Sequence, residues 1–140
     1  MVRRERAVVA ASVALFALSL ALPAIAETHP GGRRIEEPGY LILRVGSMGI
    51  MVGQFAWFAN PLWLLGLGLF WRRRWKGALM ASAAAVLVGA MSFALYRTGF
   101  PSDTGATIGV GLLIGFWVRW GSMWVLAIAA VVQNATRRSD

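Results

Sequence analysis

Long charge-free runs that end at clusters of basic residues constrain this chain more than any other feature. One run extends from Gly53 to Trp71, and another extends from Gly77 to Tyr96. A helix rises about 1.5 Å per residue, so each run is about 30 Å long as a helix, which matches the hydrocarbon core of a bilayer. We therefore expect both runs to cross a membrane.

Composition agrees with this expectation. The chain has 140 residues, 58% of them apolar, with a mean hydropathy of +0.62 and a net charge of +8. Its basic residues lie beside the apolar runs, so membrane orientation explains the charge better than nucleic-acid binding does. The absence of cysteine excludes disulfides, thiolate metal sites and haem attachment through cysteine.

The N-terminal segment has the pattern of a secretory signal. A basic tail precedes the apolar run Ala7–Leu22, and small residues follow at Ala24 and Ala26. Together with Pro23, they favour cleavage after Ala26. The alternative is an uncleaved signal anchor, because a helix from Ala7 to Ala26 is long enough to cross a bilayer. Residues 1–26 are therefore interpreted as a signal peptide or a signal anchor.

The rest of the chain predicts an all-α integral membrane helical bundle. It has four apolar spans in the precursor, or three if the first is a cleaved signal peptide. Residues 27–39 are polar and rich in proline and glycine, which predicts a periplasmic linker without a core of its own. The bundle covers residues 40–138, with spans at about 52–71, 77–96 and 114–133. Whether residues 40–51 span the membrane or lie at its interface stays open.

The distribution of basic residues predicts the orientation. With those spans, most basic residues fall on one side, and Arg33, Arg34 and Arg97 fall on the other. The first group comprises Arg3, Arg4, Arg6, Arg72, Arg73, Arg74, Lys76, Arg137 and Arg138. By the positive-inside rule that side is cytoplasmic, which predicts a bacterial inner-membrane protein with a cytoplasmic C-terminus.

Small residues predict where the helices pack. On a single helix from Tyr40 to Asn60, three glycines share one face with Asn60. Similar faces occur in the later spans, where close backbone approach replaces the hydrophobic driving force. Pro61 removes a helical hydrogen bond, so we expect a bend near Asn60-Pro61. The expected packing residues are Gly46, Gly49, Gly53, Ala81, Ala85, Gly89 and Ser122.

Four polar residues are candidates for contact with a ligand or partner: Arg44, Gln54, Asn60 and Arg119. Arg119 lies within the last apolar run, near the expected outer edge, and aromatic residues surround it. Interfacial anchoring explains these aromatic residues, and an anion site at Arg119 is the alternative. No span contains a carboxylate and the chain has one histidine, so we expect no catalytic set, metal or cofactor.

Two stretches resemble segments of small bacterial membrane proteins. The first runs from Gly53 through the Gln54–Leu62 sequence QFAWFANPL, and the second is Gly115–Met123, GFWVRWGSM. The resemblance covers about a quarter of the chain and belongs to a group with no established activity. An apolar residue is usual in that group where Arg119 stands. The resemblance therefore favours Gln54 and Asn60 as shared functional residues.

Two functions follow from these observations. The first is a non-enzymatic subunit or assembly factor, whose small-residue faces pack with a membrane-protein partner or with further copies of the chain. The second is a homo-oligomeric transporter or channel with a polar path lined by Gln54, Asn60 and Arg119. The lipid bilayer is the expected environment in both cases, and no nucleic acid is involved.

Overall fold

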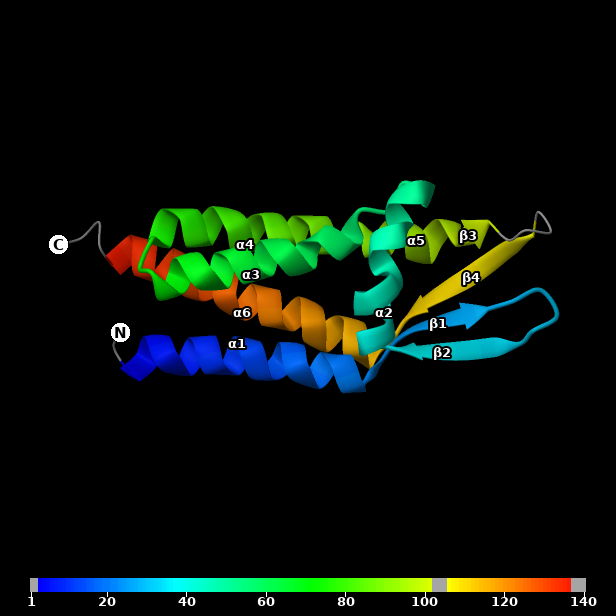
Figure 1. Cartoon of the computed structure of the whole chain (residues 1–140), viewed down its shortest axis with the longest axis horizontal. Coiled ribbons are helices and arrows are strands. Elements are labelled where there is room, and N and C mark those ends of the chain that lie inside the picture. The colour runs from blue at the N-terminus through cyan, green and yellow to red at the C-terminus, as the bar shows by residue number, and fades with distance from the viewer. Residues whose placement is uncertain (1–2, 102–105, 137–140) are drawn as a thin grey trace.

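A computed structural model describes residues 3–101 and 106–136, and it is mostly helical. Long helices run alongside one another, and the first and last described residues lie at the same end of this bundle (Figure 1). A short break after Gly89 separates α4 from α5. The bundle helices are α1 (Arg3–Ala21), α3 (Ala59–Trp71), α4 (Trp75–Gly89), α5 (Ser92–Thr98) and α6 (Ile114–Thr136).

A small antiparallel sheet extends from the opposite end of the bundle (Figure 1), so the all-α expectation is wrong. Its strand order is β2-β1-β4-β3, with β1 central between β2 and β4. The strands are β1 (Pro23–Thr28), β2 (Arg34–Pro38), β3 (Phe100–Pro101) and β4 (Thr107–Leu112).

Strand β1 begins within residues 1–26, β2 lies in the expected linker 27–39, and β3 and β4 lie between the expected spans 77–96 and 114–133. Gly31 and Gly32 adopt φ values of 97° and 83°, which allow the tight turn of the β1–β2 hairpin within the expected linker. Strand β4 pairs Leu112 with Ile25 and Gly109 with Thr28. Such pairing joins segments from opposite ends of the sequence, so a pattern read within one segment cannot reveal it.

The segment between the sheet and α3 is not the single helix expected from Tyr40 to Asn60. It consists of α2 (Gly39–Val45) and two 3₁₀ helices, η1 (Gly46–Val52) and η2 (Ala56–Phe58). Gly53 ends η1 with φ 74°, a left-handed conformation that interrupts the helix. Pro61 lies in the first turn of α3, where a missing amide hydrogen is tolerated.

Two helical runs are long and apolar enough to cross a membrane, judged by length and composition. They are Trp75–Thr98 and Ile114–Thr136, which correspond to the expected spans 77–96 and 114–133. Helix α3 has 13 residues and is about 20 Å long. Helix α1 opens with the charged sequence RRER. The structure therefore does not support four spans.

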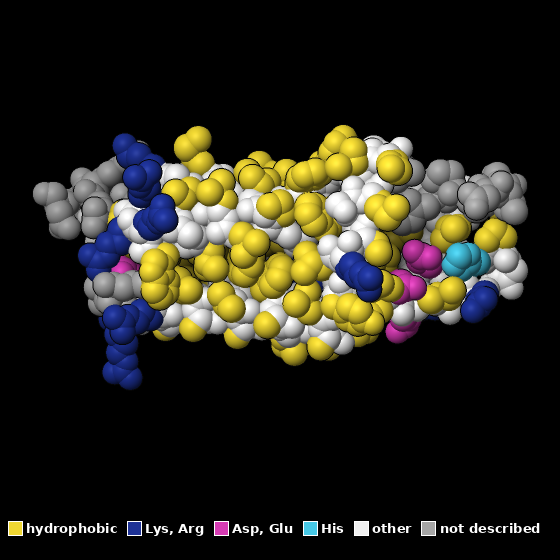
Figure 2. Space-filling model, in the orientation of Figure 1, with side chains coloured by type: hydrophobic (Ala, Val, Ile, Leu, Met, Phe, Trp, Pro, Cys, Tyr) yellow, Lys and Arg dark blue, Asp and Glu magenta, His cyan; other side chains and the backbone are white. Residues whose placement is uncertain are grey.

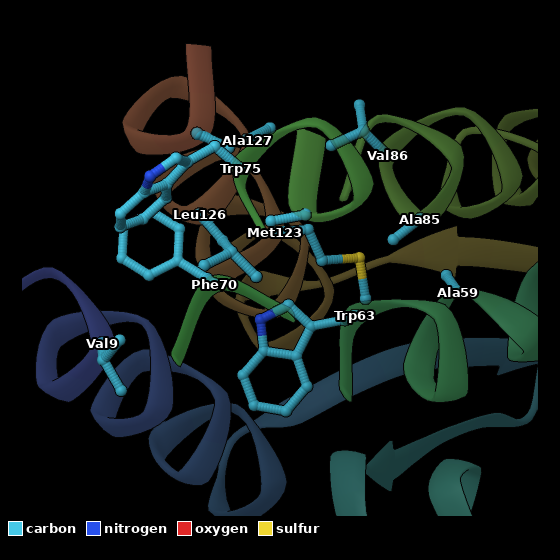
Figure 3. Close-up of a cluster of buried hydrophobic side chains, with 12 residues drawn as sticks. Val9, Ala59, Trp63, Phe70, Trp75, Ala85, Val86, Met123, Leu126 and Ala127 are labelled. Atoms are coloured by element: carbon cyan, nitrogen blue, oxygen red, sulfur yellow. The ribbon is translucent and has the colours of Figure 1, made fainter. Parts of the chain in front are cut away.

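Helix α1 contributes to the interior of the bundle. Its Phe16 ring stacks on Trp63 of α3 at a centroid distance of 4.3 Å. The Ser12 hydroxyl donates to the Ser122 carbonyl of α6 at 2.8 Å and accepts from Trp63 Nε1 at 3.0 Å. Figure 3 shows Trp63, Met123 and Leu126 among the buried side chains between the helices.

The small residues of the later spans pack inside this chain. Ala81, Ala85, Gly89 and Ser122 are all buried. Their faces therefore serve the contacts between α3, α4 and α6, as the short approach of Gly66 to the backbone of α4 illustrates.

The three glycines of the assumed Tyr40–Asn60 helix have other roles. Gly46 lies against the Trp57 ring, and Gly49 lies against Gln54. Gly53 forms the turn described above, and a side chain there would meet no atom within 4 Å. None of these three belongs to a continuous helical packing face, because the helix ends at the left-handed residue.

Charges and apolar side chains are separated along the molecule. Figure 2 shows basic side chains gathered at the end of the bundle where α1 begins, and apolar side chains along its length. The first turn of α1 and the α3–α4 connection supply these basic residues. Arg137 and Arg138, expected on the same side, lie outside the described residues.

Candidate functional site

A pocket of about 450 Å³ lies where the bundle meets the sheet. Its walls come from strands β1 and β4, from α2, η1 and η2 with the residues between them, and from the start of α3, the end of α4, and the starts of α5 and α6. Most of the lining is apolar. The polar or charged side chains in the lining are Glu27, Gln54, Asn60, Ser92 and Arg119.

Arg119 is buried, with 8% of its surface exposed, and it is held by neutral groups. Its Nε donates to the Ser19 hydroxyl at 3.3 Å, and one Nη donates to the Gly39 carbonyl at 2.7 Å. The guanidinium carbon also lies 5.5 Å from the centre of the Phe16 ring. Among the described residues no ion pair includes Arg119, so its charge lacks an acidic partner there.

Gly39 makes room for this guanidinium at the junction of α1 and α2. A Cβ there would lie 2.8 Å from Arg119 Nη2 and would collide with the Ser19 carbonyl oxygen. Because Gly39 follows Pro38 at the end of β2, the hairpin and the start of α2 bring its carbonyl to the arginine. The chain thus positions the cation with three segments that are distant in sequence.

Asn60 presents an unpaired acceptor. Its Nδ2 donates to the Trp57 carbonyl at 2.8 Å. Its Oδ1 is buried without a hydrogen-bond partner, and the residue is 5% exposed. A buried unpaired amide oxygen costs about 1–3 kcal/mol. A donor from a bound molecule would remove that cost.

Gln54 and the two tryptophans of the lining already have hydrogen-bond partners within the chain. Gln54 Oε1 accepts from the Ala56 amide at 3.2 Å. The ring nitrogens of Trp57 and Trp120 donate to the Leu43 carbonyl at 2.7 Å and the Val86 carbonyl at 3.1 Å. Both indole rings are therefore fixed as walls of the pocket.

The structure brings three of the four predicted contact residues together. Gln54, Asn60 and Arg119 line the same pocket, although Arg119 is far in the chain from the other two. Arg44 is exposed at the end of α2 and is not part of the lining.

Sequence reasoning missed the sheet side of the pocket. Glu27 and Ile25 of β1, and Ile108 and Leu112 of β4, face it. Ala24 of β1 also lines the pocket. Alternation in residues 108–112, where Ile, Val and Leu are separated by glycines, was the available signal.

The lining combines a few polar groups with apolar walls. A cation, a carboxylate and an amide oxygen are set in apolar walls, which is the pattern of a site for a small molecule. Among residues 3–101 and 106–136 no group of three or more His, Cys, Asp or Glu is positioned to hold a metal ion.

Comparisons with protein families, with characterised proteins and with solved structures find no match to this chain.

Proposed function

We propose that this chain is a non-enzymatic bacterial inner-membrane protein that binds an apolar or amphiphilic molecule in the pocket between the bundle and the sheet. The observation that carries the proposal is the convergence of Gln54, Asn60 and Arg119 on one largely apolar pocket. Arg119 lacks an acidic partner among the described residues, and Asn60 has an unpaired oxygen. Both features are costly in an empty site and useful in an occupied one.

The surface of the two long helical runs supports placement in a membrane. Large apolar side chains point outward along them, among them Met80 at 74% exposed and Leu87 at 71%. In the most apolar 18-residue stretch of each run, only 35% and 39% of the residues are buried, which is low for the core helices of a soluble protein. Lipid around the bundle would cover this surface.

The basic end supports an orientation with that end in the cytoplasm. The sheet and the pocket then lie toward the periplasm. Arg119 would lie near the outer edge of the bilayer, where a buried cation can meet a head group.

A path through a single copy is less well supported than a binding site. Trp63, Phe70 and Leu126 fill the bundle between the pocket and the basic end, and all three are at most 2% exposed. Solute flux into liposomes that is lost in Arg119→Ala would favour the transporter instead.

Fluorescence of the pocket tryptophans tests binding. A bromine-labelled fatty amphiphile, such as dibrominated monoolein, quenches indoles that it touches. We expect saturable quenching of the purified protein in detergent, because Trp57 and Trp120 line the pocket. The double variant Trp57→Phe/Trp120→Phe should lose the saturable component, whereas Trp71→Phe, at the basic end, should keep it.

Quenching that only rises linearly with probe reports partitioning into the micelle. If neutral and anionic brominated probes both behave in this way with the folded protein, the pocket does not bind amphiphiles.

A subunit or assembly factor is the second candidate function. Exposed apolar residues in η1 and in the turn between η1 and η2 favour it. Met48, Ile50 and Met51 are 64%, 47% and 85% exposed, and Phe55 is 44% exposed. Methionine-rich surfaces adapt to partners. Affinity purification in mild detergent should then recover a stoichiometric membrane protein, and Met48→Asp/Met51→Asp should release it.

A further inference from the structure

We propose that the pocket selects a phospholipid whose head group carries a phosphate next to a primary ammonium. This inference rests on the proposed function and assigns a ligand class to it. Three features of the lining, taken one at a time, lead to that head group: a cation without an acidic partner, an unpaired acceptor with a carboxylate, and walls that suit an acyl chain.

The Arg119 guanidinium favours a ligand with an anionic group. Arg119 is 8% exposed, and its two hydrogen bonds go to a hydroxyl and a carbonyl, both neutral. The ion pairs among the described residues involve other arginines and His29. A buried guanidinium without a counter-charge is costly, and a phosphate is an anion that its planar donors match. Nη1 has no hydrogen bond to any described residue and remains available to donate.

Asn60 and Glu27 favour a ligand that also carries a hydrogen-bond donor. Asn60 Oδ1 is buried and unpaired, and an anion alone cannot satisfy it. Glu27 adds a carboxylate to the lining, 27% exposed and 3.5 Å from His29 Nε2. A primary ammonium offers three donors and a positive charge, so it serves both groups, whereas a quaternary ammonium offers no donor.

The walls and the location call for an acyl chain. Ile42, Val45, Leu112 and Phe116 line the pocket, and exposed apolar side chains surround the adjoining bundle. Basic side chains gather at one end of the bundle (Figure 2), and the residues that line the pocket lie where the bundle meets the sheet, at the other end. The proposed membrane placement sets the outer head groups at that end. A lipid can therefore enter from the outer leaflet with its chain toward the bundle.

Native mass spectrometry of the full chain in detergent tests this assignment. The probes are lysophosphatidylethanolamine, lysophosphatidylcholine and monooleoylglycerol, each with an oleoyl chain, and the chain-free head group glycerophosphoethanolamine. We expect lysophosphatidylethanolamine to bind about tenfold tighter than lysophosphatidylcholine, because charge-assisted hydrogen bonds to Asn60 and Glu27 are lost in the latter. Monooleoylglycerol should bind more weakly than both.

Variants assign the preference to residues. Asn60→Leu should reduce the preference for lysophosphatidylethanolamine from about tenfold to about threefold, because Glu27 can still accept from the ammonium. Arg119→Gln should reduce both lysophospholipids to the level of monooleoylglycerol. Arg119→Lys keeps the charge but loses the planar donors, so its affinity for both lysophospholipids should lie between those of the wild type and Arg119→Gln. Arg44→Gln is the matched control, because it removes an arginine outside the pocket, and it should change nothing.

Several outcomes overturn the assignment. Equal binding of monooleoylglycerol and lysophosphatidylethanolamine by the wild-type chain removes the head-group preference but leaves amphiphile binding intact. Glycerophosphoethanolamine binding as tightly as the lysolipid shows a soluble ligand instead. Thermal unfolding shows whether Arg119→Gln folds. If it does not, the order of the lipid affinities in the wild-type chain and the reduced preference in Asn60→Leu still test the head-group assignment.

Discussion

At the scale of single residues, Gly39 joins three parts of the molecule. It starts α2, its carbonyl accepts from Arg119, and a Cβ at this position would collide with the Ser19 carbonyl near the end of α1. Gly39→Ala should lower the free energy of unfolding by about 1–3 kcal/mol, because the methyl group would overpack this junction. Denaturant unfolding in detergent measures the change.

Gly68 in α3 is the control for that substitution. A Cβ there meets nothing within 4 Å, so Gly68→Ala should be neutral or stabilise by up to about 1 kcal/mol through helix propensity. Equal effects of the two substitutions would show that the Gly39 junction is not tightly packed.

Single residues also show how far sequence reasoning reached into the site. Arg119 stood out because a charge interrupts an apolar run, and Asn60 because it is a polar residue on the expected small-residue face. Neither pattern reveals that Asn60 Oδ1 lacks a hydrogen-bond partner or that Arg119 donates to the Gly39 carbonyl. Those properties depend on the distances between side chains of different elements, which one-dimensional patterns do not contain.

At the scale of elements, the packing of α1 favours retention of residues 1–26 over their cleavage. Removal of residues 1–26 would take Ser12 and Phe16 from the bundle and would cut the central strand β1 within its pairing to β2 and β4. Ala26, at the expected cleavage site, is 3% exposed. We therefore expect the purified protein to keep its N-terminal helix.

N-terminal sequencing and intact mass measurement of membrane-extracted protein check this retention. A sequence that starts at Glu27 would contradict it and would mean that the bundle forms without α1. A signal peptidase recognises its cleavage site in the unfolded chain, whereas retention of α1 depends on contacts that form in the folded protein. The sequence therefore left both alternatives open.

At the scale of the whole molecule, the two ends of the bundle should lie on opposite sides of the membrane. The chain has no cysteine, so single cysteines report location without background. Arg33→Cys, in the exposed β1–β2 turn, should react with a membrane-impermeant maleimide in intact spheroplasts. Thr136→Cys, at the end of α6, should react only after lysis, because we place that end in the cytoplasm.

Labelling of both positions in intact spheroplasts would reverse or abolish the proposed topology. A protein that stays soluble after cell lysis, without detergent, would contradict the membrane assignment itself.

The amino-acid sequence by itself determined the helical spans expected at about 77–96 and 114–133, which the structure has at 75–98 and 114–136, and the separation of charge from apolar surface. Both depend on local composition and helical periodicity. Only the tertiary structure decided the sheet, the ending of the helix at Gly53, and the pocket that gathers Gln54, Asn60 and Arg119. These features arise from contacts between segments that are distant in the chain. Their formation depends on which alternatives pack and pair best in three dimensions, and no local pattern encodes that comparison.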